Sequence, residues 1–105
     1  SVTYSRHMAE LIKTATFDRW LSSLKDRTVA AKVAARLVRL SMGNPGDVEP
    51  VGSGISELRI HYGKGYRVYY MRRGELIIVL LCGGAKSTQK KDIKAAKMLA
   101  DEWKD

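Results

Sequence analysis

The second half of the chain alternates apolar and polar residues in the pattern of an antiparallel hairpin. If the Gly63-Lys64-Gly65 loop is centred on Lys64, Ile60 lies opposite Val68 on one side of the sheet. The other apolar residues on that side are Leu58, Tyr62, Tyr66 and Tyr70. The opposite side carries a polar row: Glu57, Arg59, His61, Arg67 and Tyr69. This register predicts that His61 lies directly across from Arg67.

A run of apolar residues follows at 76–81, with no polar position in it. Such a run is typical of a central strand that is covered on both faces. A two-residue turn at Arg73-Gly74 would pair this strand with the hairpin. We expect the next residues, 82–87, to form a Gly-rich loop that brings Lys86 close to Arg67.

Apolar residues recur at helical spacing in three other places. The first predicted helix begins after Thr16, a possible cap, and the second runs from Asp26 to Gly43. Thr88 opens the third. A short strand is predicted ahead of the helices, at 10–14, and residues 47–55 are interpreted as a loop or a weak edge strand. The inward-facing residues of the three helices are Phe17, Trp20, Leu21 and Leu24; Ala30, Val33, Ala34, Leu37 and Leu40; and Ile93, Ala96, Ala100 and Trp103.

This order of elements predicts a two-layer α+β domain, in which two N-terminal helices pack on an antiparallel sheet and a helix follows it. A chain of 105 residues is long enough for one such domain, which we place at residues 8–105. Residues 1–7 have no periodicity and end in His-Met. We interpret them as the remnant of an expression tag ahead of a natural start at Met8.

The charge of the chain narrows the class of partner. Nineteen Lys and Arg against eleven Asp and Glu give a formal net charge of +8, which favours a polyanion or an acidic protein. The single cysteine, Cys82, excludes an internal disulfide and has no companions for a zinc site, so neither a metal nor a small-molecule cofactor is expected. The sequence contains neither a signal peptide nor an apolar segment of about 18 residues, and we expect a cytoplasmic protein without membrane attachment.

The polar row and Lys86 form a candidate site for a phosphate group. Arg67, which is planar and permanently charged, would bind one phosphate, while Arg59 and Lys86 would bind the flanking phosphates. Such a cluster suits metal-free RNA cleavage, in which a ribose 2′-hydroxyl attacks the adjacent phosphate and cations stabilise the developing charge. His61 is the natural proton carrier near neutral pH, and Glu57 is a reserve general base.

These residues also carry a resemblance to a known family. The segments at 57–60, 65–70 and 83–93, with the sequences Glu-Leu-Arg-Ile, Gly-Tyr-Arg-Val-Tyr-Tyr and Gly-Gly-Ala-Lys-Ser-Thr-Gln-Lys-Lys-Asp-Ile, resemble the RelE/ParE toxin superfamily in order and spacing. The resemblance is to its HigB-like addiction-module killer branch, and it covers nearly all of residues 8–103.

The resemblance implies a RelE-like fold and a toxin, an mRNA interferase that cleaves mRNA on the ribosome. A cognate antitoxin, commonly with a helix-turn-helix, would hold it inactive. Arg67 matches the transition-state arginine of the family, Arg59 and His61 match basic positions on the preceding strand, and Lys86 matches the basic residue after the last strand. Lys90 and Lys91, at the start of the last helix, are further candidate RNA-binding residues.

Two departures from the family pattern affect this assignment. Ala85 stands where the branch commonly has Asp before the lysine, and no Tyr or His follows Tyr70. The general acid and base must then come from His61, Glu57 or Tyr69. Members of the superfamily that act on DNA gyrase without cleaving RNA are an alternative, and so is an inactive module that binds RNA or protein.

Overall fold

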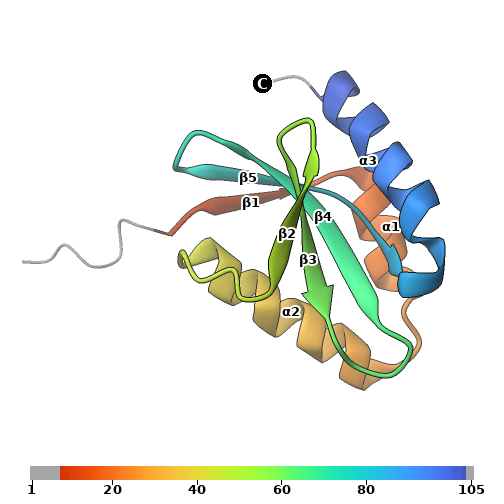
Figure 1. The fold of residues 1–105 in the computed structure, drawn as a ribbon. Coiled ribbons are helices and arrows are strands. Elements are labelled where there is room, and N and C mark those ends of the chain that lie inside the picture. The colour runs from red at the N-terminus through yellow and green to blue at the C-terminus, as the bar shows by residue number, and fades with distance from the viewer. Residues whose placement is uncertain (1–7, 104–105) are drawn as a thin grey trace, which may run out of the picture.

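The computed structural model describes residues 8–103 of the chain, which form one mixed sheet with helices on both faces (Figure 1). The sheet has five strands in the order β1-β5-β4-β3-β2, and its pairings are antiparallel except for the parallel pair β1–β5. The α+β class and the predicted order of elements are confirmed, but the domain has three layers and not two, because the C-terminal helix covers the second face, and the sheet is antiparallel except for β1–β5. The proposed tag at 1–7 lies outside the described residues. The strands are β1 Glu10–Lys13, β2 Val48–Gly52, β3 Ile55–Ile60, β4 Tyr66–Arg73 and β5 Ile77–Ala85.

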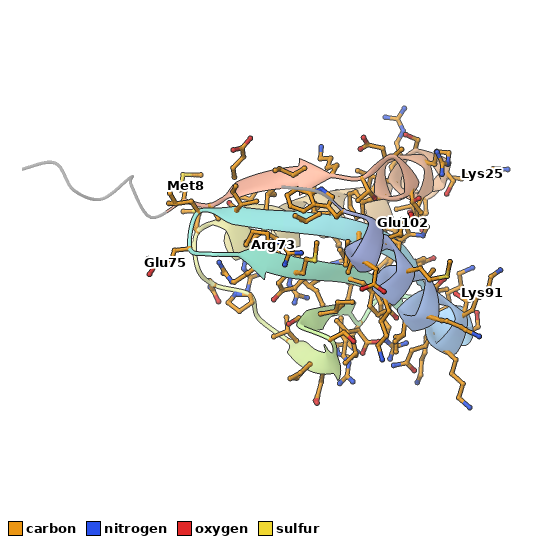
Figure 2. All side chains as sticks on the ribbon, turned by 90° about the horizontal axis from the view of Figure 1, so that it is seen from above. Met8, Lys25, Arg73, Glu75, Lys91 and Glu102 are labelled. Atoms are coloured by element: carbon orange, nitrogen blue, oxygen red, sulfur yellow. The ribbon has the colours of Figure 1, made fainter. Side chains whose placement is uncertain are left out.

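Three α-helices cover the sheet: α1 Ala15–Ser23, α2 Arg27–Ser41 and α3 Gln89–Glu102. Helices α1 and α2 pack on one face, where Phe17 and Val33 belong to the same buried cluster as Leu58 and Leu80. Helix α3 packs on the other face, where Ala96 shares a cluster with Tyr69, as Figures 1 and 2 show from two directions. None of the described helices is long and apolar enough to cross a membrane.

The starts of α1 and α2 follow from side-chain capping. As predicted, Asp26 caps α2, because its carboxylate accepts a hydrogen bond of 2.9 Å from the backbone N–H of Thr28. The predicted cap of α1 at Thr16 is wrong. The hydroxyl of Thr14 accepts from the N–H of Phe17 and donates to the carbonyl of Leu81 at 2.6 Å, so that one side chain both starts α1 and ties it to β5.

The β3–β4 register differs from the predicted one by two residues. Arg59, and not His61, lies opposite Arg67, and Ile60 lies opposite Tyr66. The connection is longer than the three-residue loop, since β3 ends at Ile60 and a turn closes between the N–H of Gly65 and the carbonyl of Tyr62 at 2.9 Å. A shift of two residues keeps every side chain on its predicted face, because strand side chains alternate with a period of two.

Strand β5 also continues further than predicted. Residues 82–85 belong to the strand and not to a loop, and a bulge between Tyr69 and Tyr70 adjusts its pairing with β4. The glycines mark close packing here. A Cβ atom on Gly83 would overlap the ring of Trp20 in α1, and one on Gly84 would overlap the carboxylate of Asp92 in α3.

Candidate functional site

The predicted cationic residues meet at one end of the sheet, around a small hollow that we call the arginine cavity. Its volume is about 50 Å³, more than the minimum that one water molecule needs. Two neighbouring strands, β3 and β4, bring Arg59 and Arg67 side by side, and the 3₁₀ turn Lys86–Thr88 supplies Lys86. The cavity is lined by Arg59, Ile60, His61, Gly65, Tyr66, Arg67 and Lys86.

Arg67 is the most enclosed cation of the arginine cavity. Its side chain is 11% exposed, and its Nε lies 3.5 Å from Oε2 of Glu57, within ion-pair range but without hydrogen-bond geometry. The buried atoms Nε and Nη1 have no hydrogen-bond partner among the described residues. Buried donors are nearly always paired. Here Nε faces the Glu57 carboxylate, and Nη1 is a donor that the contacts of the described residues leave unused.

Lys86 reaches the cavity because the hairpin loop holds its backbone. The N–H of Lys86 donates to the carbonyl of Gly65 at 3.1 Å. The prediction that β5 delivers Lys86 close to Arg67 is confirmed, although a strand and not a loop delivers it. Lys90 and Lys91 are exposed on the first turn of α3, and neither of them lines the cavity.

The buried carboxylate of Glu57 contacts both Arg59 and Arg67. Glu57 has no exposed side-chain surface, and its Oε1 accepts a hydrogen bond of 3.0 Å from Nε of Arg59. Its Oε2 accepts from the hydroxyl of Tyr69 at 3.0 Å and from Nε2 of Gln89 at 2.8 Å. Burial raises the pKa of Glu57, but the bonds from Gln89, Arg59 and Tyr69 outweigh burial, so the pKa lies below its usual value.

Glu57 and Tyr69, the other two predicted acid or base groups, are both buried and hydrogen-bonded to each other. Glu57 is ionised but enclosed by its donors. The Tyr69 side chain is fully buried, and its pKa is raised by burial and by the bond to Glu57. Neither side chain lines the cavity, and Glu57 contacts both Arg59 and Arg67.

His61 lies just beyond the end of β3 at the mouth of the cavity, where its side chain is 73% exposed. Its Nε2 contacts Oδ2 of Asp47, which precedes β2. The bond to His61 lowers the pKa of Asp47, so the carboxylate is ionised and accepts the Nε2 proton. In the neutral tautomer that donates to Asp47, the lone pair of the imidazole is on Nδ1.

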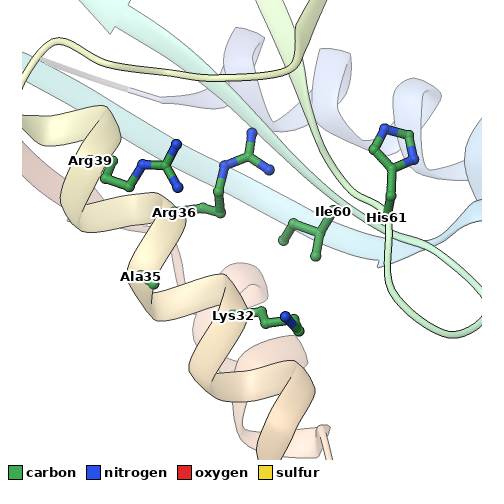
Figure 3. Close-up of a pocket in the computed structure, with 6 residues that line it drawn as sticks. All are labelled: Lys32, Ala35, Arg36, Arg39, Ile60 and His61. Atoms are coloured by element: carbon green, nitrogen blue, oxygen red, sulfur yellow. The ribbon is translucent and has the colours of Figure 1, made fainter.

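A second hollow adjoins the first on the α2 side, and we call it the helix groove (Figure 3). It measures about 270 Å³ and is lined by Lys32, Ala35, Arg36, Arg39, Ile60 and His61. Ile60 and His61 also line the arginine cavity, so the two hollows meet at the end of β3. Among the residues that the structure describes, no group of three His, Cys, Asp or Glu is placed to hold a metal ion.

Three residues of this region were absent from the sequence-based site. Asp47 and Gln89 are distant in sequence from the hairpin, and only the sheet and the start of α3 bring them to it. Arg36 is half-buried on α2 and donates to the carbonyls of Arg59 at 2.6 Å and Pro45 at 3.0 Å. The sequence at 44–47 predicts a turn, but it does not indicate that Pro45 and Asp47 contact Arg36 and His61.

Comparisons with known proteins agree with this architecture. The family model described as phage derived protein Gp49-like matches residues 19–104. An uncharacterized protein of Haemophilus influenzae is 56% identical over 89 residues, which cover 85% of this chain and 90% of that protein. In fold, the chain is similar to a chain of the toxin–antitoxin complex RelBE2 from Mycobacterium tuberculosis, with a TM-score of 0.59 and 24% identity over 75% of this chain and 99% of that one. The predicted RelE-like fold is confirmed.

Proposed function

We propose that this chain, which belongs to the phage derived protein Gp49-like family, is the toxin of a type II toxin–antitoxin module and a metal-independent endoribonuclease. Its target would be mRNA on the ribosome, as in the HigB-like branch of the RelE/ParE superfamily. A cognate antitoxin would be its protein partner. The likeness in fold to a chain of the RelBE2 toxin–antitoxin complex supports the toxin assignment.

One observation carries the proposal: Arg59, Arg67 and Lys86, from two strands and the turn after β5, line the same small cavity at one end of the sheet. In this assignment the guanidinium binds the scissile phosphate. Arg67 and Lys86 then face the non-bridging oxygens, where negative charge grows as the 2′-hydroxyl attacks. Glu57 bonds Arg59 and faces Arg67 before substrate arrives, so the two guanidinium groups are held near each other in advance of the reaction.

His61 is the proposed general base. Its Nδ1 takes the proton of the 2′-hydroxyl, the oxygen forms a bond to phosphorus, and the bond from phosphorus to the 5′-oxygen of the next nucleotide breaks. The 5′-oxygen takes a proton from solvent as it leaves, and His61 later returns its own proton to solvent, so the products are a 2′,3′-cyclic phosphate and a 5′-hydroxyl. Asp47 holds the imidazole in the tautomer that this step needs. The HigB-like branch commonly has Asp at the position of Ala85, and in this chain the carboxylate beside the site comes from Asp47 instead.

Expression in a bacterium, with primer-extension mapping of transcripts, tests the assignment. The wild-type chain is expected to arrest growth and to produce cuts at fixed positions within codons. Arg67→Gln should abolish both effects, while the matched variant Arg72→Gln, an exposed position further along β4, should abolish neither.

Circular dichroism of both variants confirms that they are folded. Growth arrest with a DNA-damage response and intact transcripts would contradict the nuclease assignment and favour a gyrase-directed toxin. Unchanged growth with the wild-type chain would reject toxicity, and unchanged cutting by Arg67→Gln would reject the site.

A further inference from the structure

We propose that the helix groove is a second phosphate-binding site, so that one RNA strand is held on both sides of His61. The proposal rests on the proposed function, because the arginine cavity is taken to hold the first phosphate.

Helix geometry puts three cations of the groove in one row. Lys32, Arg36 and Arg39 are spaced by four and three residues on α2, so they project from the same side of the helix, as Figure 3 shows. Like charges at this spacing repel each other unless an anion lies between them. The pKa of Arg36 is accordingly lowered, first by burial and then by Arg39.

Arg36 is held rigidly at the back of the groove. Its Nη1 donates to the carbonyl of Arg59 at 2.6 Å, and its Nη2 donates to the carbonyls of Pro45 at 3.0 Å and Asp47 at 3.3 Å. Its Nε is buried without a hydrogen-bond partner. Within residues 8–103, such unpaired buried side-chain atoms belong to Arg36 and Arg67 alone, which line one hollow each.

The two hollows form one cationic path over the end of β3. Strand β2 begins only at Val48, so it does not cover the sheet beside Ile60 and His61, which line both hollows. Asp47 already places an anionic group at this junction, in contact with His61.

The lining of the groove favours a nucleic acid over an acidic protein. Stable protein interfaces have apolar or aromatic anchors at their centre, whereas the apolar residues lining this groove are Ala35 and Ile60. Strongly basic, weakly apolar surfaces that adjoin a phosphate site are typical of backbone recognition in nucleic acids.

Fluorescence anisotropy with labelled 2′-O-methyl RNA tests the second site without cleavage, since this RNA has no 2′-hydroxyl. A strand of about twelve nucleotides is long enough to reach both hollows, and a dinucleotide reaches only one. For each phosphate that a protein neutralises, the slope of log K against log salt changes by about 0.7 for single strands. For the double variant Lys32→Gln/Arg39→Gln, we expect the slope to become shallower by at least about 0.7. We also expect its affinity for the long strand to fall about tenfold. Its affinity for the dinucleotide should stay unchanged.

The double variant Lys13→Gln/Arg19→Gln is the matched control, because it removes the same two charges from exposed positions on β1 and α1. It should retain the wild-type salt slope. Arg67→Gln should weaken binding of both probes. Asp47→Asn should strengthen binding of the long strand, because it removes a competing carboxylate.

Two results separate this inference from the proposed function. If the groove variant binds the long strand like the wild type while Arg67→Gln binds both probes weakly, the second site is rejected and the first stands. If Arg67→Gln binds both probes like the wild type, the arginine cavity is rejected. The second site would also be rejected if the groove variant lost as much affinity for the dinucleotide as for the long strand. Binding of polyglutamate, but not of RNA, at the groove would reject it as well.

Discussion

Nε2 of Gln89 lies 2.8 Å from Oε2 of Glu57, so the first residue of α3 donates a hydrogen bond to a buried carboxylate on β3. The same carboxylate holds Arg59 and faces Arg67. The position of the C-terminal helix and the arrangement of the cationic cavity are thereby coupled through one side chain.

Replacing Gln89 tests this coupling. Gln89→Ala should lower the free energy of unfolding by about 1.5–3 kcal/mol, because it removes a hydrogen bond to a charged group and leaves part of that group unpaired. Urea denaturation measures the change. Lys90→Ala, at the adjacent exposed position, is the control and should stay within about 0.5 kcal/mol of the wild type. Equal losses in the two variants would mean that the bond contributes nothing specific.

The start of α1 offers a direct comparison of two threonines. Thr14→Ala removes the helix cap and the bond to the carbonyl of Leu81, and it should cost about 1–2 kcal/mol. Thr16→Ala should cost less than about 0.5 kcal/mol, because its hydroxyl makes only an exposed contact to Arg19. Thermal unfolding followed by circular dichroism distinguishes the two, and the reverse order would restore Thr16 as the cap.

Alkaline pH should destabilise the fold through two buried groups. Burial raises the pKa of the Cys82 thiol to about 12, from 9.0, and the pKa of Tyr69 is also raised. The unfolded chain therefore loses these protons at lower pH than the folded one. Their contribution to stability is complete below pH 9.0 and is lost progressively as the pH rises towards about 12.

Melting temperatures recorded across this pH range check the prediction. The decrease should be smaller in Cys82→Ala, in which one of the two groups is absent. The exposed residue Ser87 provides a control, since Ser87→Ala should follow the wild-type curve. If Cys82→Ala also followed that curve, the thiol would be excluded as a source of the alkaline instability.

Gly83 should tolerate no side chain. Gly83→Ala would push a methyl group into the ring of Trp20, and it should cost about 1–3 kcal/mol or more. Gly74→Ala is the comparison: its φ of 70° disfavours a side chain, but the space is open, so the cost should be about 1 kcal/mol. In a Trp20→Leu background the loss from Gly83→Ala should shrink, and an undiminished loss in this double-mutant cycle would exclude the steric explanation.

Much of the fold could be predicted from the sequence because its signals are local. The apolar run at 76–81 and the spacing of Val33 and Leu37 are sufficient to identify a central strand and an amphipathic helix. Side-chain alternation likewise assigned Arg59 and Arg67 to one face, and that assignment holds in spite of a wrong register, because the error was two residues.

The details that failed depend on contacts between distant segments. The length of the hairpin loop is set by the turn from Tyr62 to Gly65, and the length of β5 is set by helices that approach it from both sides. The partners of His61 and Glu57 are likewise distant: Asp47 is 14 residues away from His61, and Gln89 is 32 residues away from Glu57. No periodic pattern records such pairs.

The adjacent glycines of β5, Gly83 and Gly84, lie in a tightly packed part of the strand. Adjacent glycines usually suggest a pliable segment, yet Gly83 and Gly84 are squeezed between Trp20 on one face and Asp92 on the other. The missing side chains are what allow two helices to press on the same stretch of backbone. The most glycine-rich part of the strand is therefore clamped, and its amide hydrogens should exchange with solvent among the slowest in the molecule. Lys86 is mounted on this immobile support, which fixes where its charge is presented.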